Sequence, residues 1–286
     1  MWLNPALYSS SAPSIEADTA ALPEASRTAE ALSDLAAGLA RSWIWSALSY
    51  QDIKLRYRGS LLGPFWVTLT NLILVVAMGG IYGALFHIQT EIYVPFLMCG
   101  LSIWQFISTM ATEGCAAFTA AADVIQQVPL PFSIQAYRNV CRNFIVLAHN
   151  LLIVPLGLAI FSIPITWDVL AIIPGLVLIA INGVWISILL GMVSTRFRDV
   201  PPIVASFLQV LFFLTPLIWP PELLGQWHPI ATFNPLFAAV DVVRAPLIGV
   251  PTAPSSWIML VSVTVLGCGL AFAAFARFRS RIAYWI

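Results

Sequence analysis

The strongest constraint on this chain is a succession of long apolar stretches separated by short polar or charged segments. A helix rises 1.5 Å per residue, so about 20 apolar residues cross a hydrocarbon layer of about 30 Å. We place six spans, near 65–86, 94–112, 143–163, 169–192, 203–219 and 257–276. Only 9% of the residues are charged, against about 25% in soluble domains. The sequence predicts an all-α polytopic membrane protein with six transmembrane helices.

The basic residues predict how these spans are oriented, because lysine and arginine concentrate in the cytoplasmic segments of membrane proteins. The predicted outer loops 87–93 and 162–168 contain none, and the loop after the fifth span contains only Arg244. The others lie in the N-terminal segment, two alternate loops and the C-terminus: Arg27, Arg41, Lys54, Arg56, Arg58, Arg138, Arg142, Arg196, Arg198, Arg277, Arg279 and Arg281. Both termini are therefore expected in the cytoplasm. The net charge is zero, and nothing in it indicates nucleic acid as a partner.

The chain divides into three predicted parts. Residues 1–27 are rich in Ala, Ser and Pro and are expected to form a flexible cytoplasmic tail. Residues 28–62 form an amphipathic interfacial region, in which Leu32, Leu35 and Leu39 recur at helical steps and Trp43 follows. A soluble helix that packs on a partner is the alternative for this region. Residues 63–286 form the six-span transmembrane domain.

A charged segment leads into the first span. Its cations stay at the water boundary because a charge is costly in hydrocarbon, and Gly63-Pro64 is typical of a helix start. The residues that define the segment are Asp52, Lys54, Arg56, Tyr57, Arg58, Ser60, Leu62, Gly63, Pro64 and Trp66. This run resembles the start of the first span in the permease subunits of ABC-2 type exporters of O-antigen, capsule or teichoic acid. The resemblance covers about residues 40–286.

The resemblance implies ATP-driven export of a lipid-linked polysaccharide across the bacterial inner membrane. It further implies a homodimer, embedded in membrane lipids, with two ATP-binding cassette subunits that carry ATP and Mg. This chain has no Walker A motif. We therefore expect that it is not an enzyme and that it binds no cofactor or metal. Lys54, Arg56, Tyr57 and Arg58 are predicted to meet the phosphate of the lipid carrier. Simple anchoring of the cations at the cytoplasmic surface explains them nearly as well.

The first cytoplasmic loop, residues 123–135, contains apolar residues beside two helix-breaking prolines. An apolar knob on a short helix suits the groove of a partner, and in the resembled family a similar loop docks the ATPase subunit. The predicted docking residues are Asp123, Val124, Ile125, Val128, Pro129, Pro131 and Phe132. A loop packed on its own helix ends is the alternative.

Two further loops carry charged motifs. In the second cytoplasmic loop, Asp199 is positioned to neutralise Arg196 or Arg198, although surface anchoring also explains both arginines. The outer loop after the fifth span contains Asn234-Pro235 followed by Asp241 and Arg244, whose (i, i+3) spacing allows an ion pair. We expect this outer segment to form re-entrant helices that gate the exit; an ordinary periplasmic loop is the alternative.

The aromatic residues of the spans suit a conduit, because flat rings stack on sugar faces. The candidates are Phe65, Trp66, Tyr82, Trp104, Phe106, Phe207, Phe212 and Phe213. The polar residues Asn71, Asn182 and His149 are expected to hydrogen-bond other helices, and the four cysteines to be small apolar residues. An ABC-2 permease for a drug, lipid or other small molecule remains an alternative, followed by an autonomous channel or a membrane-embedded enzyme.

Overall fold

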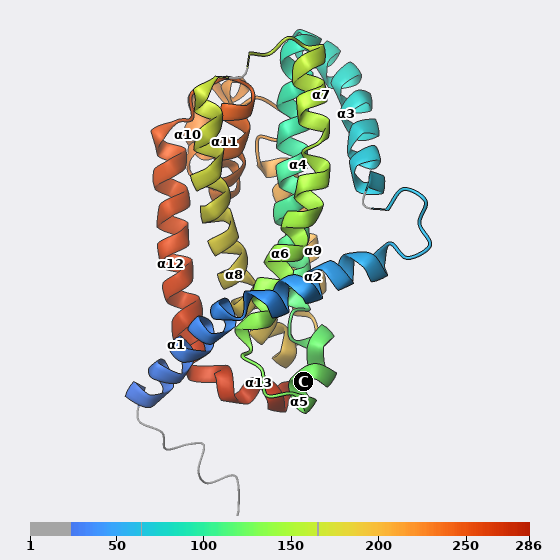
Figure 1. Ribbon diagram of the computed structural model, residues 1–286. Helices are drawn as coiled ribbons and strands as arrows, with labels where there is room; N and C mark the ends of the chain where they lie inside the picture. The colour runs from blue at the N-terminus through green and yellow to red at the C-terminus, as the bar shows by residue number, and fades with distance from the viewer. Residues whose placement is uncertain (1–23, 64, 165) are drawn as a thin grey trace, which may run out of the picture.

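The computed structural model describes residues 24–63, 65–164 and 166–286, and throughout these ranges its regular elements are helices (Figure 1). Residues 1–23 of the predicted tail lie outside the described residues, and so does Pro64 of the Gly63-Pro64 junction. The expectation of an all-helical protein is confirmed for the described part of the chain.

Five helical segments are long and apolar enough to cross a membrane. They are α3 (Phe65–Phe86), α4 (Thr90–Cys115), α6 (Ser133–Asn150) with α7 (Ile153–Ile160), α8 (Ile172–Arg196) with the preceding 3-10 turn η4 (Trp167–Ala171), and α12 (Pro254–Phe278) with η6 (Arg279–Arg281) and α13 (Ile282–Trp285). These segments overlap five of the six predicted spans. The chain is therefore a multi-pass membrane protein.

The remaining predicted span, residues 203–219, is shorter than expected. Helix α9 (Val200–Leu214) has 15 residues, which is about 23 Å of helix rise. It ends before Pro216, and the residues from Thr215 to Trp219 form bends and turns. Proline lacks the N–H that would continue the helical ladder. The count of six spans therefore stays a prediction.

The predicted interfacial region forms two helices, α1 (Glu24–Ala40) and α2 (Ser42–Arg56), which break at Arg41. Figure 1 shows them crossing one end of the bundle at a steep angle to the membrane helices. A link with positive φ at Gly59 and Gly63 connects α2 to α3. Only glycine adopts such angles without steric cost, so the link turns the chain from the surface into the first span.

The two ends of the bundle carry different elements (Figure 1). The end crossed by α1 and α2 also carries η3 (Thr119–Ala121), α5 (Ala122–Gln127) and α13, and we call it the basic end. The opposite end carries η5 (Pro221–Trp227), α10 (His228–Thr232) and α11 (Pro235–Leu247).

Polar side chains join the membrane helices to one another. Asn71 of α3 donates to the hydroxyl of Ser102 of α4 at 2.8 Å, and Asn182 of α8 donates to Thr264 of α12 at 2.6 Å. These two predictions are confirmed. His149 differs, because its ring nitrogen lies 2.7 Å from the Ile145 carbonyl of its own helix. The cysteines are all free: Cys99 and Cys115 are buried, and Cys141 and Cys268 are half-buried.

Candidate functional site

An ion cluster joins α2, α4 and α6 at the basic end. We define it as Asp52, Arg56, Glu113, Arg138 and Arg142. Arg138 donates two hydrogen bonds to the Asp52 carboxylate, at 2.5 and 2.7 Å. Arg142 bridges the two acids, donating to Asp52 at 2.7 Å and to Glu113 at 2.7 and 3.0 Å. Arg56 donates to the other Glu113 oxygen at 2.6 Å. The cluster thus ties the surface helix α2 to two membrane helices.

Amides on α6 support the cluster. Asn143 donates to Glu113 at 3.0 Å, and Asn139 accepts from Arg142 at 3.0 Å. Asn139 also donates to the Ser187 hydroxyl of α8 at 2.9 Å. Residues three and four apart share a helix face, and the positions 138, 139, 142 and 143 show this spacing. The sequence reasoning missed the cluster, although this repeat of arginine and asparagine on α6 was a usable signal.

Asp52 stays ionised at neutral pH in this cluster. Partial burial alone would raise its pKa, but hydrogen bonds and charge from Arg138 and Arg142 outweigh this effect and lower the pKa below its usual value of 3.8. The carboxylate therefore contributes its bonds to both arginines throughout the physiological pH range.

The four residues that the sequence predicted to contact a lipid phosphate lie in different environments. Arg56 is paired with Glu113. Lys54 and Arg58 are exposed, and Tyr57 is half-buried. The described structure shows no ion pair for Lys54 or Arg58. Those two cations retain their capacity to bind an anion, whereas Arg56 would first have to leave Glu113.

A groove runs between α4 and α9, with a volume of about 510 Å³. Beside Trp104, its α4 wall contains the polar residues Gln105, Ser108, Thr109 and Thr112, whose spacing places them on one helix face. Glu113 of the ion cluster follows Thr112 directly in the chain. The α9 wall contributes Gln209 together with aromatic residues. We call this the α4–α9 groove.

The polar face of α4 is unusual for a membrane helix. Gln105 donates to Thr109 at 2.9 Å, Ser108 to the Gln105 carbonyl at 3.2 Å, and Thr112 to the Ser108 carbonyl at 2.9 Å. These bonds stay within one helix, and Gln105 is exposed. Polar groups that face lipid are costly, so this face requires water, substrate or a second chain. Sequence reasoning missed it, although residues at i, i+3, i+4 and i+7 were visible.

The predicted conduit aromatics fall into different environments. Trp104, Phe212 and Phe213 line the α4–α9 groove, with the Trp104 and Phe212 ring centroids 5.7 Å apart. Phe106 instead packs inside the bundle, edge-on to Phe144 at 4.9 Å. The remaining candidates lie on α3 or α9: Phe65, Trp66 and Phe207 are exposed, and Tyr82 is half-buried. The structure brings three of the eight candidates together with the polar face of α4.

The predicted docking loop presents a small apolar surface. Val124 is 38% exposed and Val128 45% exposed; Asp123 and Pro129 are also exposed, and Pro131 is half-buried. Ile125 and Phe132 instead pack towards the buried cluster that contains Phe118. The outward face of α5 therefore exposes Val124 among the polar residues Asp123, Gln126 and Gln127, and the exposed Val128 follows the helix.

Asp34 of α1 fastens this loop to the rest of the basic end. Its buried carboxylate accepts hydrogen bonds from the backbone N–H groups of Phe132 and Ser133, at 3.1 and 3.0 Å, at the start of α6. It also accepts from Arg279 at 2.9 Å. An anion at a helix N-terminus satisfies donors that have no partner inside the helix. We call this set of contacts the Asp34 clasp. No sequence pattern indicates it, because the partners of Asp34 are about 100 and 245 residues away.

The second loop departs from the expected pairing. Arg196, Arg198 and Asp199 are all exposed, and in the described part of the chain no ion pair joins Asp199 to either arginine. Arg196 instead lies over the ring of Trp285, 5.9 Å from its centroid. Asp199 precedes α9, whose first turn contains two prolines, Pro201 and Pro202. The motif marks the start of α9.

The ion pair that the sequence allowed at the opposite end is not among those formed by the described residues. Arg244 is 2% exposed, donates to the Pro216 carbonyl at 2.9 Å and lies over the Phe96 ring at 4.0 Å. Asp241 accepts from Ser256 of α12 at 2.7 Å. Despite their (i, i+3) spacing, each side chain makes its hydrogen bond to a different segment. Both residues fix α11 in place.

Asn234 and Pro235 form the start of α11. The Asn234 side chain accepts from the backbone N–H groups of Leu236 and Phe237, at 2.9 and 3.2 Å, as an N-cap. Its amide donates to Thr215, just after α9, at 3.1 Å. Pro235 takes the first helical position, where its missing N–H removes no bond. The Asn-Pro pair thus joins α11 to the end of α9.

The described residues contain no group of three or more His, Cys, Asp and Glu side chains arranged to hold a metal ion. The two carboxylates of the ion cluster accept hydrogen bonds from arginine and asparagine side chains instead. The chemistry that the site offers is hydrogen bonding, ring stacking and charge pairing.

Comparisons with known proteins agree with this architecture. The profile of the family described as ABC-2 type transporter matches residues 44–248. An O-antigen export system permease protein RfbA from Klebsiella pneumoniae is 26% identical over 198 residues, covering 68% of this chain and 75% of that protein. A protein of the same name from Myxococcus xanthus is 30% identical over 181 residues, covering 61% of this chain and 67% of that protein.

Proposed function

The chain belongs to the ABC-2 type transporter family, and on that premise we propose that it is the membrane subunit of an ATP-driven polysaccharide exporter in the bacterial inner membrane. The relatives named as O-antigen export permeases support this choice of substrate class. The substrate we propose is a lipid-linked glycan that moves outward from the cytoplasm. ATP and Mg would be bound by a separate nucleotide-binding subunit.

The α4–α9 groove is the observation that carries the proposal. It combines amides and hydroxyls with the rings of Trp104, Phe212 and Phe213. Sugars present hydroxyl groups at their edges and C–H surfaces at their faces, so this lining matches a polysaccharide better than a purely apolar drug. A glycan would exchange hydrogen bonds with the polar face of α4 while it moved along the rings.

A homodimer completes the proposed conduit. Helix α9 has no buried residue, and α3 buries little of its surface. Both helices expose large apolar side chains, as the bundle also exposes the polar face of α4. In the proposed assembly α3 and α9 meet a second copy, six spans cross the membrane, and α10 and α11 form a re-entrant gate. Both termini lie in the cytoplasm together with the basic end, and two ATPase subunits bind there.

An export assay with a matched pair of variants tests this proposal. Ser108 lines the groove and Ser262 lies exposed on α12, and each hydroxyl bonds to a carbonyl of its own helix. We expect Ser108→Phe to obstruct the groove and reduce surface polysaccharide at least tenfold in cells that depend on this chain, whereas Ser262→Phe leaves it unchanged. Membrane abundance of both variants is the control. Normal export by an abundant Ser108→Phe protein would exclude the groove as the route.

A further inference from the structure

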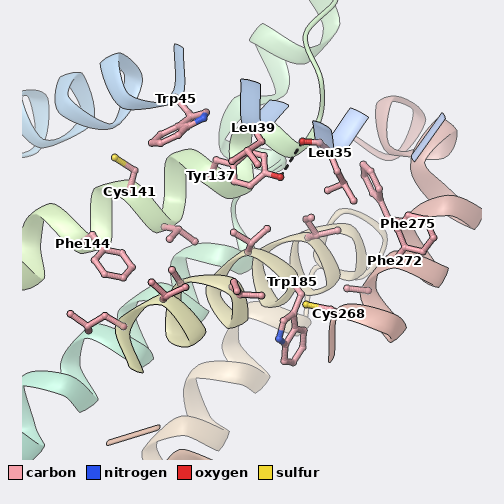
Figure 2. Close-up of a pocket in the computed structure, with 18 of the residues that line it drawn as sticks. Leu35, Leu39, Trp45, Tyr137, Cys141, Phe144, Trp185, Cys268, Phe272 and Phe275 are labelled. Carbon is pink, nitrogen blue, oxygen red and sulfur yellow. Dashed lines mark hydrogen bonds between the residues drawn. The ribbon is translucent and has the colours of Figure 1, made fainter. Parts of the chain in front are cut away.

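A second groove lies on the chain, between the surface helices α1 and α2 and the membrane helices α6, α8 and α12 (Figure 2). Its volume is about 880 Å³, and it shares no residue with the α4–α9 groove. Its walls are almost wholly apolar, with Leu35 and Leu39 from α1 and Phe272 and Phe275 from α12. The Tyr137 hydroxyl is already used, since it donates to the Leu35 carbonyl at 3.1 Å.

The apolar walls of this groove suit a bound hydrocarbon chain. Apolar cavities do not retain water stably, and unfilled walls lose their dispersion contacts. The α8 wall runs from Ile173 to Ile188, about 22 Å of helix rise. That length exceeds one leaflet of a hydrocarbon core of about 30 Å. The groove is therefore long enough for an acyl chain of a lipid from the surrounding membrane.

The end of the groove beneath α1 and α2 supplies polar groups at headgroup level. The indole Nε1 of Trp45 is buried and has no hydrogen-bond partner among the described residues. Figure 2 shows the Trp45 ring above Cys141 and beside Tyr137. Arg41 is exposed at the break between α1 and α2, four residues before Trp45 in the chain. No ion pair of Arg41 occurs in the described structure.

We propose that this groove is a binding site for one anionic phospholipid of the host membrane. An acyl chain lies along α8 between α6 and α12, Arg41 pairs with the headgroup phosphate, and the Trp45 N–H donates to a phosphate or ester oxygen. Basic side chains near anionic lipid contribute about 1 kcal/mol each, so Arg41 sets the preference for negative charge. The bound lipid would hold α1 and α2 against the bundle independently of what the protein transports.

Native mass spectrometry of the full-length protein tests this site. The purified protein is stripped of lipid and titrated with phosphatidylglycerol or phosphatidylcholine that carry the same acyl chains. Ala180 lines the groove, whereas Ala273 is exposed on α12 outside it, so Ala180→Trp and Ala273→Trp form a matched pair. Arg41→Gln removes the cation from an exposed position and leaves the packing intact.

We expect the wild-type chain to retain one phosphatidylglycerol in preference to phosphatidylcholine. Ala180→Trp should reduce this retention at least tenfold, and Ala273→Trp should match the wild type. Arg41→Gln should reduce phosphatidylglycerol retention about fivefold and phosphatidylcholine retention less, because the choline cation already offsets the phosphate charge. This variant tests the site if Ala180→Trp does not fold. Equal retention of the two lipids, equal behaviour of the two tryptophan variants, or a polyprenyl lipid as the occupant would overturn the proposal.

Discussion

At the scale of single residues, Arg142 holds the ion cluster together because it is bonded to both Asp52 and Glu113. Its planar fork of donors suits two carboxylates at once, which a lysine ammonium cannot reproduce. The sequence shows each of these charges, but it does not show that α2 and α6 cross so that the charges meet. The sequence also does not connect Glu113 to its partners Arg56 and Arg142, because these lie 57 and 29 residues away.

Arg142→Gln should lower the free energy of unfolding by about 2 kcal/mol, because Asp52 and Glu113 would each lose one of their two arginine partners. Arg198→Gln is the matched control, since Arg198 is exposed and makes no ion pair in the described structure; its effect should stay within about 0.5 kcal/mol. Unfolding in mixed detergent micelles measures both. Equal effects of the two substitutions would contradict the structural role of the cluster.

The pKa of Asp52 predicts an acid limit to stability. Since the folded-state pKa is lowered below 3.8, the contribution of Asp52 is fully present above the unfolded-state pKa and disappears as the pH falls through the folded-state pKa. Thermal unfolding should therefore show this contribution unchanged from pH 5 to 8 and lost below about pH 4. In Asp52→Asn this part of the pH dependence should vanish. A wild-type and a variant curve that fall in parallel would refute the assignment.

At the scale of elements, α1 and the start of α6 are joined by the Asp34 clasp, and α5 lies next to this junction. The apolar pattern of residues 123–132 predicted a docking knob, but it did not distinguish inward from outward side chains. Ile125 and Phe132 turn inward because α1, α13 and Phe118 supply a buried surface for them. The apolar surface left for the proposed docking is consequently smaller than predicted and centres on Val124 and Val128.

Val124→Asp combined with Val128→Asp should weaken binding of the ATPase subunit at least tenfold, because a partner groove would have to bury two new charges. Gln126→Glu, on the same short helix, adds charge without removing apolar surface and should bind normally. Pull-down of the ATPase subunit by the tagged membrane chain compares the variants. If all bind alike, α5 is not the docking element.

Asp34→Ala should destabilise the basic end by about 2 kcal/mol, because the N–H groups of Phe132 and Ser133 lose their acceptor at the start of α6. Glu30→Ala removes the outer partner of Arg279, which is partly exposed, and should cost less than about 1 kcal/mol. Hydrogen exchange at the α6 N-terminus reports the difference. Faster exchange in both variants to the same extent would argue against the clasp.

At the scale of the whole molecule, apolar periodicity predicted the membrane helices well, because hydrocarbon leaves a chain few other solutions. The span 65–86 coincides with α3 (Phe65–Phe86). The early end of α9 was not predicted, since the apolar run continues past Leu214 and only Pro216 indicates that the helix ends there. The α4–α9 groove depends on which face of each helix turns outward, and this is decided by packing between helices that the sequence alone does not specify.

The central claim is that this chain is the membrane subunit of an ATP-driven exporter, and its association with an ATPase tests the claim most directly. The tagged chain should be expressed with the ATP-binding cassette protein of the same source, purified, and measured by native mass and ATP turnover. We predict a complex of two membrane chains and two ATPase subunits that hydrolyses ATP. A folded membrane chain that binds no ATPase would contradict the account.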